Sequence, residues 1–593
     1  MEFRLRNREL RPDPIKFFRS SRFEPHFLDR FGHSKTLTGH EGCVNCLQWN
    51  AAGTLLASGS DDLKVRIWDL DGKELHGFYS GHVNNIFSVQ FLPSGHGKVI
   101  ISAAGDRTVR MHSYTYSSSP QVWYSDGRVK RLAVTPADPH LFWSASEDGI
   151  IRQLYKFLQY DTRTNKVLNL LTFGEKECKS LALNESHPDM LAVALNEAPV
   201  PVYDRRNPST PLLTLVPGHI PLVDESSRSY KPLSVTHVGF NSVGNELIVN
   251  IGGEQIYIFN VLDKVDEPDA LMSLKQLLSK KSESGTKTIS KKSTARFKKL
   301  RELAKIHFSN GEYTDAIDAY SSAIAECEFM WSKGKAKQKD CAGDLCLLLS
   351  NRGASYLRRR WEGDVYACLL DTIRALKIDR GNIKAHYRII RALYELKQYG
   401  MAEEMLNLFE IRFPNNNLCD DLRKQLREIQ ESSIVWTSNG TSDYVQRLCG
   451  HCNTNTDIKE AVWFGGRDEY IAAGSDCGSL LIWERKSGVL IKAYEADKNI
   501  LNCVQPHPSS CLLATSGIEH VIRFWDILPE NREKSRRERH NLVSLSKENQ
   551  DRMHTGMFEM VFASIGHSYE GDGEGEGEGE GEGEGRFLNC NTS

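Results

Sequence analysis

Short apolar runs separated by turn-forming residues make up residues 38–70, and this stretch sets the pattern for much of the chain. The runs CVNCLQW, LLASGS and KVRIW lie between Gly39-His40 and Trp68-Asp69. Runs of this length predict β-strands, and the turn formers between them predict hairpins. The stretch therefore predicts one small antiparallel sheet, which needs neighbouring sheets because it cannot bury both of its faces alone.

A spacing of about 40 residues between a Gly-His pair and a Trp-Asp pair resembles one blade of a WD40 propeller. The resemblance implies that His40, Ser60, Asp62 and Trp68 form a hydrogen-bonded network tying the loops of the blade to its third strand. Such a network agrees with the rule that buried polar side chains have to satisfy one another. We therefore expect a WD40 fold.

The same pattern recurs along the chain. Four more candidate blades precede residue 265 and two follow residue 432. The second blade has Asp106 at the position of Asp62 but lacks the Trp-Asp pair, and six residues, Leu154–Gln159, are inserted before the end of the third. Five blades plus two give seven, within the usual range of about four to eight. We expect the strand around residues 34–38 to complete the last blade, which would hide its edge.

Residues 295–432 change from a strand-like to a helical period. In ARFKKLRELAKIHFSNGEYTDAIDAYSSAIAEC, small residues at Ala304, Ala316 and Ala323 are interspersed with aromatic residues, and two similar units follow. This arrangement resembles the tetratricopeptide (TPR) helix-turn-helix repeat, in which small residues let paired helices approach and aromatic residues fill the gaps. Three units meet the minimum of about three for a self-supporting stack.

Together these patterns predict a multidomain β + α protein, a seven-bladed WD40 β-propeller with an α-helical TPR domain inserted between blades five and six. The predicted parts are an N-terminal segment (1–33), blades 1–5 (34–264), a basic linker (265–294), the TPR domain (295–432), blades 6–7 (433–529), a charged helical extension (530–568) and a Gly/Glu tail (569–593). Because the tail cannot bury a core, we expect it to be disordered.

Charge and composition narrow the function classes. The net charge is −2 (75 Lys+Arg against 77 Asp+Glu), which argues against a general attraction to nucleic acid or membranes. No apolar run approaches the ~18–20 residues of a membrane helix, and the N-terminus lacks the apolar region of a secretory signal. Fourteen Cys without framework spacing indicate reduced thiols, so we expect a cytoplasmic and nuclear protein.

No motif of a known catalytic class is present, and we expect no enzymatic activity, no cofactor and no metal. The sequence lacks GxSxG, GxxxxGK[ST], HExxH and a GxGxxG that opens a helix. Cys43-x-x-Cys46 and Cys449-x-x-Cys452 have the spacing of zinc ligands, but residues three apart in a strand point to opposite faces. We therefore interpret these cysteines as core residues.

Two blade ends carry an Asp-x-Arg motif. Blade three ends with Asp161 and Arg163, and blade four ends with Asp204 and Arg206. The motif resembles the WDxR box of WD40 substrate receptors for cullin-4 ubiquitin ligases, and the resemblance implies that these arginines face the propeller adaptor of the ligase. A planar guanidinium suits such a contact because it pairs bidentately with carboxylates. The alternative is an ordinary surface arginine after a strand.

The predicted TPR domain carries polar and cationic residues at positions of its concave groove. Arg301, Asn351, Lys384 and Arg388 fall where chaperone-binding TPR proteins hold the terminal carboxylates of a peptide, whereas Lys305 stands where that family has Asn. The resemblance implies that the groove binds an acidic peptide or tail. The alternative is ordinary solvated charge on helix faces.

The combination of repeats is more specific than either repeat. Stretches such as HEGCVNCLQWN, NELIVNIGGEQIYIF and GHCNTNTDIKEAVWFG resemble the adipose family of WD and tetratricopeptide repeat proteins. The resemblance implies a non-catalytic receptor that recruits protein substrates to a cullin-4 RING ubiquitin ligase, with the basic-aromatic segment 14–31 either gripping the adaptor or docking on the propeller rim. The alternative is a scaffold that binds chaperone tails or histone and histone-deacetylase complexes without a ligase.

Overall fold

The described part of the chain forms seven sheets, antiparallel except for one short parallel pair, and a helical domain. The computed structural model describes residues 27–95, 97–113, 121–155, 167–220, 233–262, 273–274, 277, 295–332, 338–414, 416–428, 441–529 and 536–566. The predicted N-terminal segment before residue 27, most of the basic linker and the Gly/Glu tail lie outside these residues, as do Asp161 and Arg163.

The first three sheets follow one another directly in the sequence. They contain β2 (Val44–Trp49), β3 (Leu55–Ser60), β4 (Lys64–Asp69) and β5 (Glu74–Tyr79); β6 (Ile86–Phe91), β7 (Val99–Ala104), β8 (Thr108–Ser113) and β9 (Gln121–Tyr124); and β10 (Val129–Val134), β11 (Leu141–Ser146), β12 (Ile150–Tyr155) and β13 (Leu168–Thr172). Strand β12 includes the first two residues of the predicted insertion Leu154–Gln159, and the other four lie outside the described part of the chain.

Of the remaining four sheets, three include a strand from a distant part of the chain, and the sheet of β23 to β26 is continuous in sequence. They contain β14 (Cys178–Leu183), β15 (Met190–Leu195), β16 (Val200–Asp204), β17 (Leu213–Leu215) and β21 (Thr441–Ser442); β18 (Ser234–Phe240), β19 (Glu246–Gly252), β20 (Ile256–Asn260) and β22 (Gln446–Leu448); β23 (Ala461–Phe464), β24 (Tyr470–Gly474), β25 (Ser479–Glu484) and β26 (Leu490–Glu495); and β27 (Leu501–Pro506), β28 (Leu513–Gly517), β29 (Val521–Ile527) and β1 (Phe31–Thr38).

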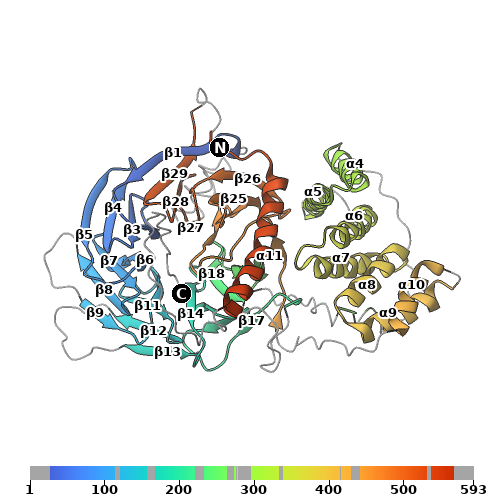
Figure 1. Ribbon diagram of the computed structural model, residues 1–593, viewed down its shortest axis with the longest axis horizontal. Helices are drawn as coiled ribbons and strands as arrows, with labels where there is room; N and C mark the ends of the chain where they lie inside the picture. The colour runs from blue at the N-terminus through green and yellow to red at the C-terminus, as the bar shows by residue number, and fades with distance from the viewer. Residues whose placement is uncertain are drawn as a thin grey trace, which may run out of the picture.

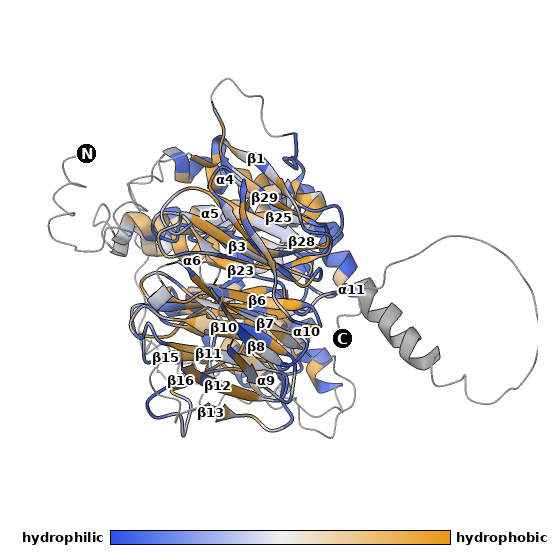
Figure 2. Cartoon of the chain, turned by 90° about the vertical axis from the view of Figure 1, so that its left-hand side faces the viewer, coloured by the Kyte–Doolittle hydropathy of each residue, from blue (hydrophilic) through white to orange (hydrophobic). Residues whose placement is uncertain are grey.

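The sheets stand side by side in a ring (Figure 1). The first strand of each sheet contacts the first strand of the next, in the order β2, β6, β10, β14, β18, β23 and β27, and β27 contacts β2 again. The apolar cores lie between adjacent sheets, as in the cluster that joins Cys46 and Ala57 to Ile86 and Ile100. Strands such as β6 and β16 are accordingly rich in apolar residues (Figure 2). The predicted WD40 propeller is confirmed.

The ring closes between the two ends of the propeller sequence. Strand β1 pairs antiparallel with β29, with Phe31 opposite Ile527 and Thr38 opposite Val521. This is the pairing that the sequence predicts for residues 34–38. The short helix η1 (Phe27–Asp29) precedes β1, and the side chain of Phe27 packs edge-on against Phe464. The last residues of the basic-aromatic segment therefore dock on the propeller itself.

Among the residues that the structure describes from 295 to 428, the helical domain has three helix pairs and a short final helix. The pairs are α4 (Ala295–Asn310) with α5 (Tyr313–Ser332), α6 (Gln338–Arg359) with α7 (Asp364–Ile378), and α8 (Ile383–Glu395) with α9 (Tyr399–Arg412), followed by α10 (Asp420–Arg427). The pairs coincide with the three helix-turn-helix units that the sequence predicts. The buried small residues Ala304, Ala316 and Ala323 lie in their common core, and the domain stands beside the ring (Figure 1).

The helices interrupt the fifth sheet, which corrects the prediction that they lie between blades five and six. Strand β22, which follows the helices, pairs with β20, which precedes them, with Ile256 opposite Leu448. Strand β21 pairs in parallel with β17 of the fourth sheet. The sequence misleads here because the segment around Gln446–Leu448 directly precedes a Gly-His pair and so seems to open a new blade, whereas it completes the preceding sheet.

An aromatic cluster joins the helical domain to the ring. The ring of His219 lies 5.5 Å from Tyr366 of α7 and 6.0 Å from Tyr257 of β20, and Tyr444 lies 5.1 Å from Tyr257. The hydroxyl of Tyr366 donates a hydrogen bond of 2.5 Å to Asp443. Aromatic pairs in such geometries stabilise a contact beyond the effect of burying their apolar area. This cluster therefore fixes the helices against the fourth and fifth sheets.

Helix α11 (Leu542–Gly566) covers part of one face of the ring. The amide of Asn549 donates to the carbonyl of Gly450, and the amide of Gln255 donates to Gln550. Leu545 is buried in the core between the fifth and sixth sheets. No helix in the described part of the chain is both long and apolar enough to cross a membrane.

Candidate functional site

A buried network links the loops of the first sheet to its third strand, but its serine is Ser58. The imidazole of His40 lies 2.8 Å from the carboxylate of Asp62 and 2.7 Å from the hydroxyl of Ser58, which also accepts a hydrogen bond of 2.9 Å from Trp68. Ser60, which the sequence predicts for this role, donates instead to the carbonyl of Gly42. Ser60 lies at the end of β3, two residues beyond Ser58 and so farther along the strand from the indole of Trp68.

The second sheet contains an equivalent network, which the sequence analysis missed. His82 lies 2.9 Å from Asp106 and 2.8 Å from Ser102, and Ser102 lies 2.8 Å from His112. His112 pairs with Ile100 just as Trp68 pairs with Leu56, so it occupies the position of the missing Trp. In both sheets the serine that shares its hydroxyl stands two residues after the residue that pairs across the strands with the Trp or His. That spacing could have identified the serine.

The carboxylates of Asp62 and Asp106 are ionised in these two networks. Burial by itself raises the pKa of Asp62 and of Asp106, but the hydrogen bonds from His40 and His82 outweigh it and lower each pKa to about 2. Burial lowers the pKa of His112 to about 3, so this ring is neutral. The networks therefore have a structural role in shaping the blades.

Arg206, the predicted adaptor contact, is an exposed side chain at the end of the third strand of the fourth sheet. Its side chain is 67% exposed and pairs with Asp204 at 2.8 Å and with Asp189 at 3.1 Å. Successive connections of an antiparallel sheet alternate between its two ends, so Arg206 lies on the face opposite the loop of Gly450 that α11 covers.

The neighbouring Arg205 has a different role. Its guanidinium donates to the carbonyl of Pro188 at 2.7 Å, pairs with Asp138 at 2.5 Å and lies 5.0 Å from the ring of Trp143. Since Pro188 belongs to the fourth sheet and Trp143 to the third, Arg205 joins two sheets. The other predicted Asp-x-Arg pair, Asp161 and Arg163, lies outside the described residues, so its position relative to Arg206 stays a prediction.

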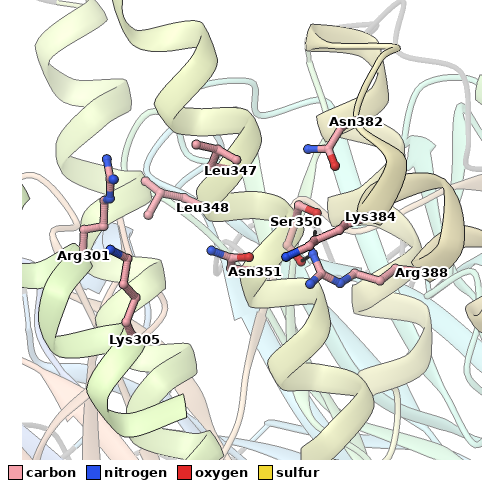
Figure 3. A pocket seen from close by; sticks show the side chains of 9 residues that line it. All are labelled: Arg301, Lys305, Leu347, Leu348, Ser350, Asn351, Asn382, Lys384 and Arg388. Atoms are coloured by element: carbon pink, nitrogen blue, oxygen red, sulfur yellow. Dashed lines mark hydrogen bonds between the residues drawn. The ribbon is translucent and has the colours of Figure 1, made fainter. Parts of the chain in front are cut away.

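The structure brings all four predicted groove residues together in one cavity of the helical domain. The cavity has a volume of about 250 Å³ and is lined by Arg301, Lys305, Leu347, Leu348, Ser350, Asn351, Asn382, Lys384 and Arg388. Helices α4, α6 and α8, the first helices of the three pairs, provide these side chains except Asn382, which caps the start of α8 (Figure 3). No acidic side chain is among them.

Neighbouring groups hold three of the four cations in this cavity, among them Lys305, which pairs with Glu302 at 3.1 Å. The guanidinium of Arg388 donates at 2.6 Å to the carbonyl of Ser350 and at 2.5 Å to its hydroxyl, and burial lowers the pKa of Arg388. Arg301 pairs with Asp344 at 3.0 Å. Lys384 is exposed and makes no ion pair within the described part of the chain. The positive charge of the cavity is thus only partly neutralised by neighbouring groups.

A second cavity adjoins the first and shares Lys384 and Arg388 with it. Its volume is about 610 Å³, and its lining consists of Phe308, Ala354, Leu357, Arg358, Arg360, Lys384, Tyr387, Arg388, Arg391, Glu395 and Leu418. Its lining therefore contains both apolar and cationic side chains, with a single carboxylate. We call the two cavities together the helical groove. It can hold an extended segment that carries both acidic and apolar residues.

The thiols of the two Cys-x-x-Cys pairs are buried or partly buried. Burial raises the pKa of the thiols of Cys46 and Cys449, and it raises that of Cys452 to about 12. Among the described residues, one group of three potential ligands lies within 4.8 Å, namely His307, Glu312 and Asp315, and none of these three is buried.

Comparisons with known proteins agree with the propeller. The family described as WD domain, G-beta repeat matches residues 32–69, 72–113 and 488–526. The chain is 32% identical to WD and tetratricopeptide repeats protein 1 of Mus musculus, with 94% of each chain covered. It is 30% identical to DDB1- and CUL4-associated factor 6 of Mus musculus, over 40% of this chain and 28% of that protein.

A solved propeller structure is among those that match. The Myceliophteria_thermophila Cps50 (Swd1) beta-propeller domain has a TM-score of 0.43 and 14% sequence identity, covering 84% of this chain and all of its own. The identity of 32% over 94% of both chains is the finding that decides the family.

Proposed function

Because the chain belongs to the WD and tetratricopeptide repeats protein 1 family, we propose that it is a non-catalytic substrate receptor of a cullin-4 RING ubiquitin ligase. The similarity to a protein named as an associated factor of DDB1 and CUL4 supports this role. The propeller binds the propeller adaptor of the ligase, and the helical domain binds a protein that is to be ubiquitinated. The seven sheets then act as the seven blades of one ring, and the three helix pairs as TPR repeats.

The exposure of Arg206 is the observation that carries the proposal. Its guanidinium is 67% exposed but is held by Asp204 and Asp189, so it stands on the surface in a restricted orientation. An arginine ordered in this way loses little further freedom when it binds, and its planar fork can take a carboxylate of a partner. Arg205, one residue earlier, is occupied within the fold.

The two functional surfaces are separate. Arg206 belongs to the fourth sheet of the ring, whereas the helical groove lies on α4, α6 and α8 of the helical domain. A receptor needs this separation because the adaptor and the substrate have to be bound at the same time. The contacts of Tyr366 with His219 and Asp443 keep the helical domain in one place relative to the ring.

The proposal is tested by co-purification of the adaptor. We expect Arg206→Ala combined with Arg163→Ala to weaken adaptor binding by about 2 kcal/mol, roughly 30-fold, while the fold persists. Arg107→Ala is a matched control, because Arg107 is exposed and lies between the second and third strands of its sheet, on the opposite face. Unchanged recovery of the adaptor with the double variant would overturn the proposal.

The charge of the helical groove favours a second candidate, a scaffold that binds acidic tails of chaperone or chromatin proteins without a ligase. Four of the nine residues that line the first cavity are cationic. This function requires the groove and does not require Arg206. A chain that binds acidic tails but recovers no cullin-4 adaptor in affinity purification would support the scaffold and exclude the receptor.

A further inference from the structure

The helical groove carries cations in both of its cavities. The first cavity is lined by Arg301, Lys305, Lys384 and Arg388, and the second adds Arg358, Arg360 and Arg391 beside apolar side chains. The two cavities are neighbours, since Lys384 and Arg388 line both. A suitable ligand therefore has several carboxylates and apolar residues close to them.

The same chain contains a segment with this chemistry. Residues 570–585 alternate Gly with seven Glu and one Asp and contain no cation, and Phe587-Leu588 follow almost directly. In an extended chain every second residue points to the same side, so these carboxylates would stand roughly 7 Å apart along one edge. Glycine between them adds no side chain that could clash with the helices. The segment lies outside the described residues.

We propose that the acidic segment 570–588 binds the helical groove of the same molecule, with its carboxylates beside Lys305 and Lys384 and with Phe587-Leu588 in the partly apolar second cavity. Charge complementarity selects this occupant, since the first cavity has no acidic lining residue and the segment has no basic one before Arg586. The segment then competes with any acidic partner of the groove. This inference goes beyond the receptor role and does not depend on it.

Tethering makes a weak contact effective. A segment joined by a short flexible linker has an effective concentration of about 1 mM at its own site. If the free segment binds with a dissociation constant of about 100 μM, the tethered one weakens an external acidic peptide by about tenfold. Because the contacts are between exposed charges, we expect this competition to weaken as the salt concentration rises. The screening length falls to about 3 Å at 1 M salt.

The test uses the full chain and a chain that ends after Ser568, which retains all of α11. A fluorescent peptide with the sequence of residues 568–590 is titrated with each protein at low salt, and its anisotropy is measured. We expect the shortened chain to bind the peptide about tenfold more tightly than the full chain. A full chain with all eight acidic residues of 570–585 replaced by amides should bind the peptide as tightly as the shortened chain does.

Two variants locate the contact. Lys305 and Lys384 are both exposed, so Lys305→Glu with Lys384→Glu should keep the fold, which circular dichroism verifies, and should abolish peptide binding. Lys377→Glu is the matched control, because Lys377 is an exposed lysine of α7 outside both cavities. Equal affinities of the full and shortened chains would overturn the proposal. So would peptide binding that survives the double variant or that Lys377→Glu reduces to the same extent.

Discussion

Asp364, the first residue of helix α7, forms a buried ion pair with Arg447 of strand β22. The side chains are 0% and 4% exposed, and Arg359 completes the group with a contact of 2.9 Å to the same carboxylate. Burial by itself raises the pKa of Asp364, but the two guanidinium groups outweigh it and hold the pKa below its ordinary value. A charge of the helical domain is thus neutralised by a charge of the ring.

We expect Asp364→Asn to loosen the helical domain from the ring. The substitution leaves Arg359 and Arg447 buried without a counter-charge, which typically costs about 3–5 kcal/mol. Urea unfolding should show a lower midpoint, and limited proteolysis should release a helical fragment sooner. Glu362→Gln is the control, because it removes a charge from an exposed side chain in the same turn. Equal unfolding midpoints for Asp364→Asn and the native chain would contradict the expectation.

The blade networks predict a loss of stability in acid. The folded chain holds the pKa of Asp62 and Asp106 at about 2, below their ordinary value of 3.8. Their contribution to stability is therefore present above pH 4 and is lost as the pH falls from about 4 to about 2. Unfolding measured across this range should depend less steeply on pH in Asp106→Asn. Asp71→Asn, at a side chain that is 92% exposed, should keep the native dependence.

Arg205 and Arg206 should separate stability from binding. Arg205→Ala removes hydrogen bonds to Pro188 and Asp138 and a contact with Trp143, so it should lower the free energy of unfolding by about 1–3 kcal/mol. Arg206→Ala should change it by less than about 0.5 kcal/mol, since that side chain is mostly exposed. Thermal unfolding of both variants checks the difference. Equal destabilisation would mean that Arg206 is also part of the fold.

Much of the propeller and the groove could be predicted from the sequence because their signals are local. The Gly-His and Trp-Asp pairs mark single sheets, and the positions of Arg301, Asn351, Lys384 and Arg388 follow from the period of their helices. These residues line one cavity, as the pattern indicates. Ser58 was missed because two serines two residues apart point to the same side of a strand, and only the position of Trp68 distinguishes them.

The contacts between distant segments could not be predicted. Arg447 stands 83 residues after its partner Asp364, and no repeat pattern relates the two. The prediction that the helices lie between blades five and six was wrong for a similar reason, since β22 is short and its partner β20 lies before the whole helical domain. Pairing over such separations depends on the closed ring and not on any local preference.

Gly450 provides a final prediction, about the docking of helix α11. The backbone of Gly450 has φ +105°, which side chains rarely adopt, and a Cβ atom there would lie 2.6 Å from the hydroxyl of Ser546. Gly450→Ala should therefore both strain the loop, by about 1–3 kcal/mol, and push α11 away from the ring. Hydrogen exchange should increase in residues 542–554 more than in the strands of the sixth sheet.

Asn549→Ala should produce the same local release by a different route. Its amide donates at 2.8 Å to the carbonyl of Gly450, so the substitution leaves that buried carbonyl without this donor. Because both changes act on one contact, their effects on exchange should be less than additive in the double variant. The matched control is Lys547→Ala, on an exposed side of the same helix. Exchange that rises equally in the control, or that adds fully in the double variant, would show that Gly450 and Asn549 do not hold α11 together.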